Sequence, residues 1–282
     1  MTSFTEVGDR VWVARHEWYD VNITAVEGES GVLVVDTHAS SEAAREVIDA
    51  LRRVTRRPVT ALVNTHDHFD HWFGNSAFTE VYGDLPIIAH ETCVELMADS
   101  GATVQQEASS WTQPRSPEVA VTRLVPATRS FSSASTIDLG DRVVELVHPG
   151  RGHTAGDLVV RIGDADVVLA GDLVEESADP SYGSDCHPLE WPGALDLVLG
   201  LVGAQTVVVP GHGAPVDSDF VAEQHDSIAI VARTIQDLAG RGVGVDRALE
   251  EGEWPYPRAS LTHAVRRGYE QLPRSARQLP LL

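Results

Sequence analysis

The sequence predicts an α/β protein in which helices cover the faces of β-sheets. Short apolar segments of strand length alternate along the chain with amphipathic helical segments. This cycle of strands and helix occurs twice, and in each half an apolar strand is followed directly by polar side chains. Hydrophobic residues make up 43% of the 282 residues, which excludes a mostly disordered chain. We therefore expect a layered architecture with a substantial core.

The first part of the chain contains strands and one helix. Three strands come first, at residues 11–14, 23–26 and 32–35. A helix then begins after Ser40 or Ser41, either of which can cap its free backbone N–H groups. Its apolar residues recur at i, i+3, i+4 and i+7 and form one buried stripe: Ala44, Val47, Ile48 and Leu51. Pro58 ends the helical region, and residues 59–63 form the next strand.

The middle of the chain is less regular. A strand is predicted at residues 86–89 and a helix at residues 91–98. Residues 100–135 are rich in Ser, Thr and Pro. We expect an irregular excursion here, which either covers a pocket as a lid or is a solvated surface loop.

A second cycle of strands and helix follows. Its strands are predicted at residues 143–147, 158–162, 167–170 and 206–209, and its helix at residues 191–201. Two similar halves that face each other would bring the ends of their strands together. Two further helices are expected, at residues 220–238 and 260–269, with no phosphate-binding loop among them. We expect residues 1–215 to form the main domain and residues 216–282 a helical extension packed on it.

The charge of the chain bears on its partners. The formal net charge is −21, from 42 acidic and 21 basic residues, and every basic residue is arginine. Nucleic acids and anionic membranes are bound by clustered Lys and Arg, so we expect neither as a partner. Residues 1–12 lack the basic and hydrophobic parts of a signal peptide, and no segment approaches the ~20 apolar residues that cross a bilayer. The two cysteines are too few for a disulfide framework, so the expected location is the cytoplasm.

The densest polar cluster comes directly after the strand at residues 59–63: Asn64-Thr65-His66-Asp67-His68-Phe69-Asp70-His71. Imidazoles and carboxylates packed this closely would each need a hydrogen-bond partner if they were only buried. Neutral imidazole and carboxylate instead suit zinc and similar divalent ions. In an extended loop His66 and His68 point the same way, while Asp70 and His71 turn elsewhere. The cluster therefore predicts metal ligands.

Three more polar residues lie at predicted strand ends: His153, Asp172 and His212. Each of them alone is more often a hydrogen-bonded turn residue. Together with the first cluster they supply five histidines and two aspartates. That set is large enough for two metal ions that share ligands.

The series His66-x-His68-x-Asp70-His71, then His153, Asp172 and His212, resembles the motifs of the metallo-β-lactamase superfamily. The resemblance covers residues 11 to 212. It implies an αββα sandwich with the site at one edge between two sheets. It further implies two divalent metal ions, zinc in the first place, with iron and manganese as the other candidates.

The resemblance also implies a role for each site residue. His66, His68 and His153 would hold one ion, Asp70, His71 and His212 the other, and Asp172 would bridge them. Asp36, at the end of the strand at residues 32–35, would orient a ligand rather than bind metal, with turn capping as its other interpretation.

Two bound ions make a bridging hydroxide available near neutral pH, so the expected activity is hydrolysis of a small ester, thioester, lactone or amide. Asp70 is the candidate catalytic residue, which orients the hydroxide and passes a proton to the leaving group; ligation alone is its other role. The superfamily name does not give the activity, because the cysteine-using β-lactamases have Cys where this chain has Asp172.

Three other functions follow from the same scaffold. The first alternative is a mononuclear iron dioxygenase that acts on persulfides. An RNA-processing nuclease is disfavoured by the charge of −21. A non-catalytic binding module is disfavoured because no ligand position is missing.

A small-molecule substrate requires a pocket beside the ligands. The candidate lining residues follow the ligands closely in sequence: Trp72, Phe73, His187 and Trp191. The alternative is that the three aromatic residues belong to the hydrophobic core and that His187 lies in a surface turn.

Overall fold

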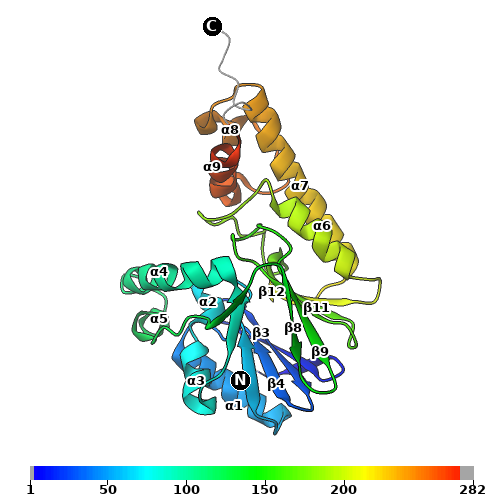
Figure 1. The fold of residues 1–282 in the computed structure, drawn as a ribbon. Coiled ribbons are helices and arrows are strands. Elements are labelled where there is room, and N and C mark those ends of the chain that lie inside the picture. The colour runs from blue at the N-terminus through cyan, green and yellow to red at the C-terminus, as the bar shows by residue number, and fades with distance from the viewer. Residues whose placement is uncertain (1–2, 274–282) are drawn as a thin grey trace.

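The computed structural model describes residues 3–273. Two β-sheets lie face to face, and helices cover the outer face of each, so the chain forms an αββα sandwich (Figure 1). The predicted fold class is therefore confirmed. Residues 1, 2 and 274–282 of the predicted domains lie outside the described part of the chain.

The first sheet has seven strands in sequence order. They are β1 (Thr5–Gly8), β2 (Val11–Arg15), β3 (Asn22–Gly28), β4 (Gly31–Val35), β5 (Val59–Val63), β6 (Ile87–His90) and β7 (Arg129–Phe131). The strands from β1 to β4 pair antiparallel, and those from β4 to β7 pair in parallel. Parallel strands end at the same edge of a sheet. Asp36 and the cluster that starts at Asn64 therefore meet where β4 and β5 end.

The second sheet has the order β12-β11-β10-β9-β8. Its strands are β8 (Ala134–Asp138), β9 (Val143–Val147), β10 (Val159–Ile162), β11 (Val167–Glu175) and β12 (Val207–His212). Only the pair β11 and β12 is parallel within this sheet. β11 is longer than the predicted strand at residues 167–170, so Asp172 lies inside a strand, and its predicted position at a strand end is wrong.

Strand β4 shows how the core is divided. All five of its residues are buried. Val32 and Val34 pack under the helices of the first outer layer. Leu33 and Val35 pack between the two sheets, together with residues of the second sheet such as Leu146. Successive strand residues point to opposite faces, so a strand covered on both sides needs an uninterrupted apolar sequence.

The helices on the first sheet are α1 (Ser41–Val54), α2 (Phe69–Trp72), α3 (Asn75–Tyr82), α4 (Glu91–Ala108) and α5 (Ser116–Val121). Helix α1 begins as predicted, because the Ser40 side chain accepts a hydrogen bond from the backbone N–H of Ala43. The predicted stripe of α1 is buried. The sequence does not predict the short helices α2 and α3, because α2 overlaps the polar cluster at residues 64–71 and α3 has only eight residues.

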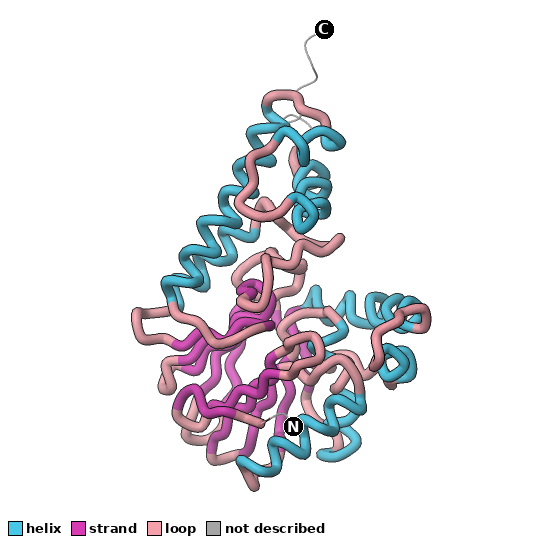
Figure 2. Tube along the Cα trace, turned by 180° about the vertical axis from the view of Figure 1, so that it is seen from behind, coloured by secondary structure: helices cyan, strands magenta, loops and turns pink. Residues whose placement is uncertain are grey.

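The remaining helices are α6 (Trp191–Leu201), which contacts β11, and α7 (Ser218–Gly240), α8 (Val245–Glu251) and α9 (Thr262–Gln271), with a 3₁₀ turn at Arg258–Leu261. Helix α7 starts beside the sheets and runs away from them, and α8 and α9 pack on its far part (Figure 2). These helices share one hydrophobic cluster with β11. The boundary at residue 215 stays a prediction.

The expectation of one irregular excursion over residues 100–135 is wrong. Helix α4 continues to Ala108, and α5, β7 and the start of β8 follow. Helix α4 turns small or apolar residues inward, and Gly101 lies so close to Trp72 that a Cβ there would come within 2.7 Å of the indole ring. Polar residues such as Thr103 and Gln106 on the exposed side of α4 hide this pattern in the sequence. Within residues 3–273, no helix has the length and apolarity needed to cross a bilayer.

Candidate metal centre

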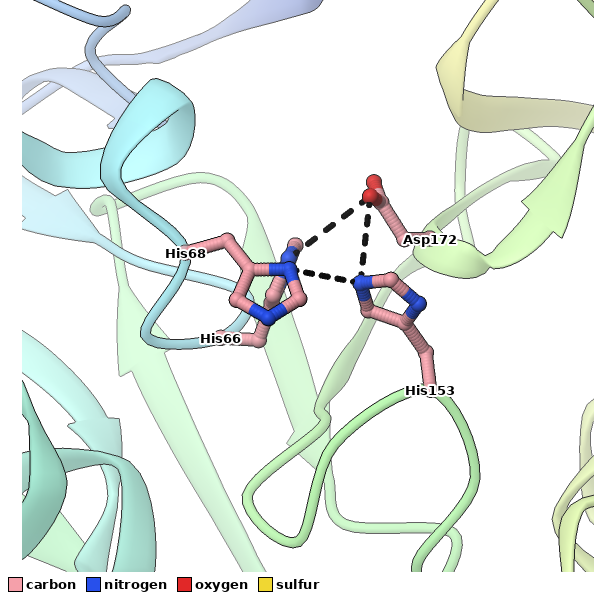
Figure 3. Close-up of side chains that lie close together, drawn as sticks. All are labelled: His66, His68, His153 and Asp172. Carbon is pink, nitrogen blue, oxygen red and sulfur yellow. Dashed lines mark hydrogen bonds and ion pairs between the residues drawn. The ribbon is translucent and has the colours of Figure 1, made fainter. Parts of the chain in front are cut away.

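The predicted ligands meet at one edge of the sandwich and form two groups. In the first group, donor atoms of His66, His68, His153 and Asp172 all lie within 4.8 Å of one another (Figure 3). In the second group the same holds for Asp70, His71 and His212. These groups contain the two sets of ligands that the resemblance implied, with Asp172 placed in the first group.

Asp172 lies between the two groups. Its Oδ2 is 3.4 Å from His153 Nε2 and 3.7 Å from His66 Nε2 in the first group. The same carboxylate reaches the second group, with Oδ1 3.2 Å from His71 Nε2 and Oδ2 3.2 Å from His212 Nε2. One side chain thus faces both sets of donors.

Three histidines have one ring nitrogen engaged by an acceptor outside the cluster. Nδ1 of His71 lies 2.8 Å from Asp36 Oδ2, Nδ1 of His153 lies 2.9 Å from the Ser181 carbonyl, and Nδ1 of His212 lies 2.7 Å from the Tyr19 carbonyl. Carboxylate and carbonyl oxygens only accept hydrogen bonds, so in a neutral ring the proton stays on Nδ1. The lone pair is therefore on Nε2, which faces the centre in all three.

The remaining two histidines, His66 and His68, also have one ring nitrogen engaged by a hydrogen-bond partner. Nε2 of His68 lies 2.9 Å from Asp185 Oδ2, which leaves Nδ1 as the donor atom. The Thr65 hydroxyl donates to Asp36 and so accepts from Nδ1 of His66, 3.0 Å away. Outer hydrogen bonds of this kind fix the tautomer and the orientation of metal-binding imidazoles.

The donor atoms fit divalent metal ions. Nδ1 of His68 and Nε2 of His153 are 2.8 Å apart, and Nε2 of His71 and of His212 are 3.3 Å apart. Two lone pairs at these distances repel unless a proton or a cation lies between them. His66 Nε2 and Asp172 Oδ1 are buried without a hydrogen-bond partner. Three imidazoles and a carboxylate are a common zinc donor set.

Without a bound metal ion, protonation of some of the imidazoles supplies positive charge beside the carboxylates. Burial lowers the pKa of His212, but Asp172 and Asp70 outweigh burial and raise it to about 10. For His68, Asp185 outweighs burial and raises the pKa to about 9. Burial prevails at His153 and lowers its pKa to about 4. The carboxylates therefore keep part of the imidazole set protonated at neutral pH.

Asp36 holds the turn after β5 in place. Its carboxylate accepts hydrogen bonds from the backbone N–H and the hydroxyl of Thr65, each at 2.8 Å, besides that of His71. Asp36 itself has a φ of 62°, a left-handed conformation that is uncommon outside glycine. The Asp36 carboxylate contacts both the His71 ring and the turn at Thr65, and it orients His71 through its hydrogen bond.

The loop that carries His153 is organised by Asp157. The buried Asp157 carboxylate accepts hydrogen bonds from the backbone N–H groups of Gly152 and Thr154 and from the Thr154 hydroxyl.

The approach of β12 to Asp172 requires glycine at position 211, because a Cβ there would overlap Oδ1 of Asp172.

Three of the four candidate pocket residues are in the core instead. Trp72, Phe73 and Trp191 have no exposed surface, and the two indoles donate hydrogen bonds to the carbonyls of Asp67 and Leu173. Their expected place in a pocket wall is therefore wrong, because a fully covered ring cannot touch a substrate. His187 is 7% exposed, and its Nδ1 lies 3.2 Å from Nε2 of Gln271 at the end of α9.

Other residues near the centre carry no sequence signal. Asp185, which holds His68, and Glu175, which lies beside Asp172 and His212, belong to none of the sequence motifs, although Glu175 is only three residues after Asp172. A pocket of about 530 Å³ is lined by residues that include Trp18, His38 and Arg115. Only the folded chain brings these groups to the same region.

The fold and the site together define a class, the αββα proteins with a candidate metal centre at the edge of their two sheets. The family model described as "Metallo-beta-lactamase superfamily" matches residues 16–222, and the chain belongs to this family. The chain is 24% identical over 288 residues to a linear primary-alkylsulfatase from Pseudomonas sp., with 90% of this chain and 54% of the relative covered. It is 25% identical over 221 residues to metallo-β-lactamase type 2 from Bacillus cereus, with 75% and 76% covered.

A solved structure has a similar fold. The inverting sec-alkylsulfatase Pisa1 from Pseudomonas sp. superimposes with a TM-score of 0.76 at 17% identity, over 96% of this chain and 50% of the other. The chain thus spans about half the length of the alkylsulfatases that it resembles.

Proposed function

We propose that this protein is a dinuclear metallo-hydrolase that cleaves a small ester, thioester, lactone or amide. The observation that carries the proposal is the position of Asp172, whose two carboxylate oxygens lie within 3.2 to 3.7 Å of ring nitrogens from both donor groups. A carboxylate shared in this way suits two ions held side by side. Three imidazoles and a carboxylate favour zinc in the first group.

Bound divalent ions supply Lewis acidity, since they lower the pKa of coordinated water and polarise a substrate oxygen. His66, His68 and His153 would hold one ion and Asp70, His71 and His212 the other. Asp70 Oδ2 is 3.5 Å from His212 Nε2 and 3.8 Å from His71 Nε2. We assign Asp70 a second task, which is to orient the attacking water and to carry its proton to the leaving group.

The proposed substrate is a small molecule. A formal net charge of −21 disfavours a long polyanion, so we do not carry the nuclease forward. We also leave the mononuclear dioxygenase aside, because both donor groups are complete. The relatives named as alkylsulfatase and metallo-β-lactamase add alkyl sulfates and β-lactams to the substrates worth testing. The cytoplasm remains the proposed location.

Elemental analysis of untagged protein, purified without chelator, tests the proposal first. We expect two zinc ions per chain and turnover of at least one member of a panel of esters, thioesters, lactones, β-lactams and alkyl sulfates. A single iron per chain together with oxygen uptake would contradict the proposal. So would metal-loaded protein that hydrolyses no member of the panel.

A further inference from the structure

A third carboxylate lies at the second donor group. One donor atom each from Asp172, Glu175 and His212 lie within 4.8 Å of one another, and all three residues are buried. The ligand series discussed so far gives Glu175 no role. Its position three residues after Asp172 needs a structural explanation.

Residues three apart on a regular strand point to opposite faces. In the pairing of β11 with β12, Gly171 lies opposite Pro210 and Glu175 lies opposite His212, so four steps along β11 match two along β12. This β-bulge adds residues to one strand only and redirects their side chains. It places both carboxylates of β11 at the edge where His212 ends β12.

Within the described part of the chain, the Glu175 carboxylate has the His212 ring beside it but no arginine. Its side chain is 5% exposed, and its Oε1 accepts from the backbone N–H of Ser177 at 3.1 Å and from the Ser177 hydroxyl at 2.5 Å. No arginine in residues 3–273 makes an ion pair with it, and the chain contains no lysine. Buried carboxylates are ordinarily paired with a cation or coordinate a metal, and the group that faces Glu175 here is the His212 ring, which is itself a donor of the second group.

The backbone of Glu175 is held in place as well. The buried Gln224 of α7 accepts from its N–H at 3.1 Å and donates to its C=O at 2.7 Å. This pair of hydrogen bonds restricts where the carboxylate can go. The position is therefore rigid, as a ligand position must be.

We infer that Glu175 is a further ligand of the ion held by Asp70, His71 and His212. The inference rests on the proposed function, which supplies that ion. The two sites then differ in chemistry. The first has three imidazoles and Asp172, whereas the second has two imidazoles and the carboxylates of Asp70, Asp172 and Glu175. Oxygen-rich sites with more than four donors suit Mn²⁺ better than tetrahedral nitrogen-rich sites do.

The test compares Glu175→Gln with Glu176→Gln in the full chain. Both variants remove one negative charge at neighbouring positions, but Glu176 accepts a hydrogen bond from the backbone N–H of Ala214 and belongs to neither donor group. Competition with a fluorescent chelator gives the dissociation constants for Mn²⁺ and Zn²⁺, and the absorption spectrum of Co²⁺-loaded protein reports the coordination number. We expect Glu175→Gln to raise the dissociation constant for Mn²⁺ at the more weakly binding of the two sites at least tenfold. The dissociation constant for Zn²⁺ should rise by a smaller factor. Its Co²⁺ spectrum should shift towards fewer ligands, while Glu176→Gln changes each constant less than twofold.

Unchanged constants and an unchanged Co²⁺ spectrum in Glu175→Gln would overturn the inference. The thermal midpoint of the metal-free protein distinguishes a ligand role of Glu175 from a structural role. Removing an unpaired buried carboxylate should leave this midpoint unchanged or raise it. A clear drop would show that the fold itself needs the carboxylate, and would also overturn the inference. Failure of the proposed function looks different, because the wild-type protein itself would then bind fewer than two ions.

Discussion

At the scale of single residues, Asp172 and His187 have different tasks. Asp172 faces both donor groups, whereas His187 contacts Gln271 of α9. We expect Asp172→Ala to lower metal content by at least one ion per chain and turnover by at least ~100-fold, because the shared ligand is lost. His187→Ala should keep both ions and leave turnover within the same order of magnitude, because the buried His187 side chain contacts α9 and belongs to neither donor group. Metal analysis and steady-state kinetics on both variants measure this, and full metal content in Asp172→Ala would rule out the bridging role.

The protons on the imidazoles make metal binding depend on pH. His212 and His68, with pKa values of about 10 and about 9, carry protons at neutral pH that a bound metal ion must displace. Raising the pH removes these protons, so affinity should rise with pH by about tenfold per unit for each proton displaced. Calorimetry of zinc binding in buffers of different ionisation enthalpy counts the protons. An affinity that stays constant between pH 6 and 8 would contradict this prediction.

At the scale of elements, the contact between β11 and α7 connects the helical extension to the site. Gln224 satisfies both backbone groups of Glu175, and all of these groups are buried. We expect Gln224→Ala to lower the free energy of unfolding by about 2–4 kcal/mol, since two buried backbone groups lose their partners. Urea denaturation measures the change. Glu223→Ala, an exposed neighbour on the same helix, should change stability by less than ~0.5 kcal/mol, and equal stability in both variants would show that the contact is not needed.

At the scale of the whole molecule, the candidate metal centre lies between the two sheets. His66, His68, Asp70 and His71 follow β5 in the first sheet, while Asp172 and His212 belong to β11 and β12 in the second. A ligand that binds only the folded chain stabilises it by about 4 kcal/mol at a thousand times its dissociation constant. We expect chelation of the metal to lower the thermal midpoint by several degrees. Returning zinc should restore the midpoint, and a midpoint that does not respond to chelator would mean that the ions do not link the sheets.

The sequence by itself determined the layered fold, most strands, helices α1, α6, α7 and α9, and the candidate metal ligands, whose division into two groups was implied by the resemblance to the metallo-β-lactamase superfamily. Alternating apolar residues and the close spacing of His66, His68, Asp70 and His71 are local properties, so they can be read from the chain. The tertiary structure alone decided which ring nitrogen of each histidine faces the centre. It also brought Asp185 to His68 and Glu175 to His212, and it buried Trp72, Phe73 and Trp191. These results depend on a bulge in β11 and on contacts between residues far apart in sequence, which no local pattern encodes.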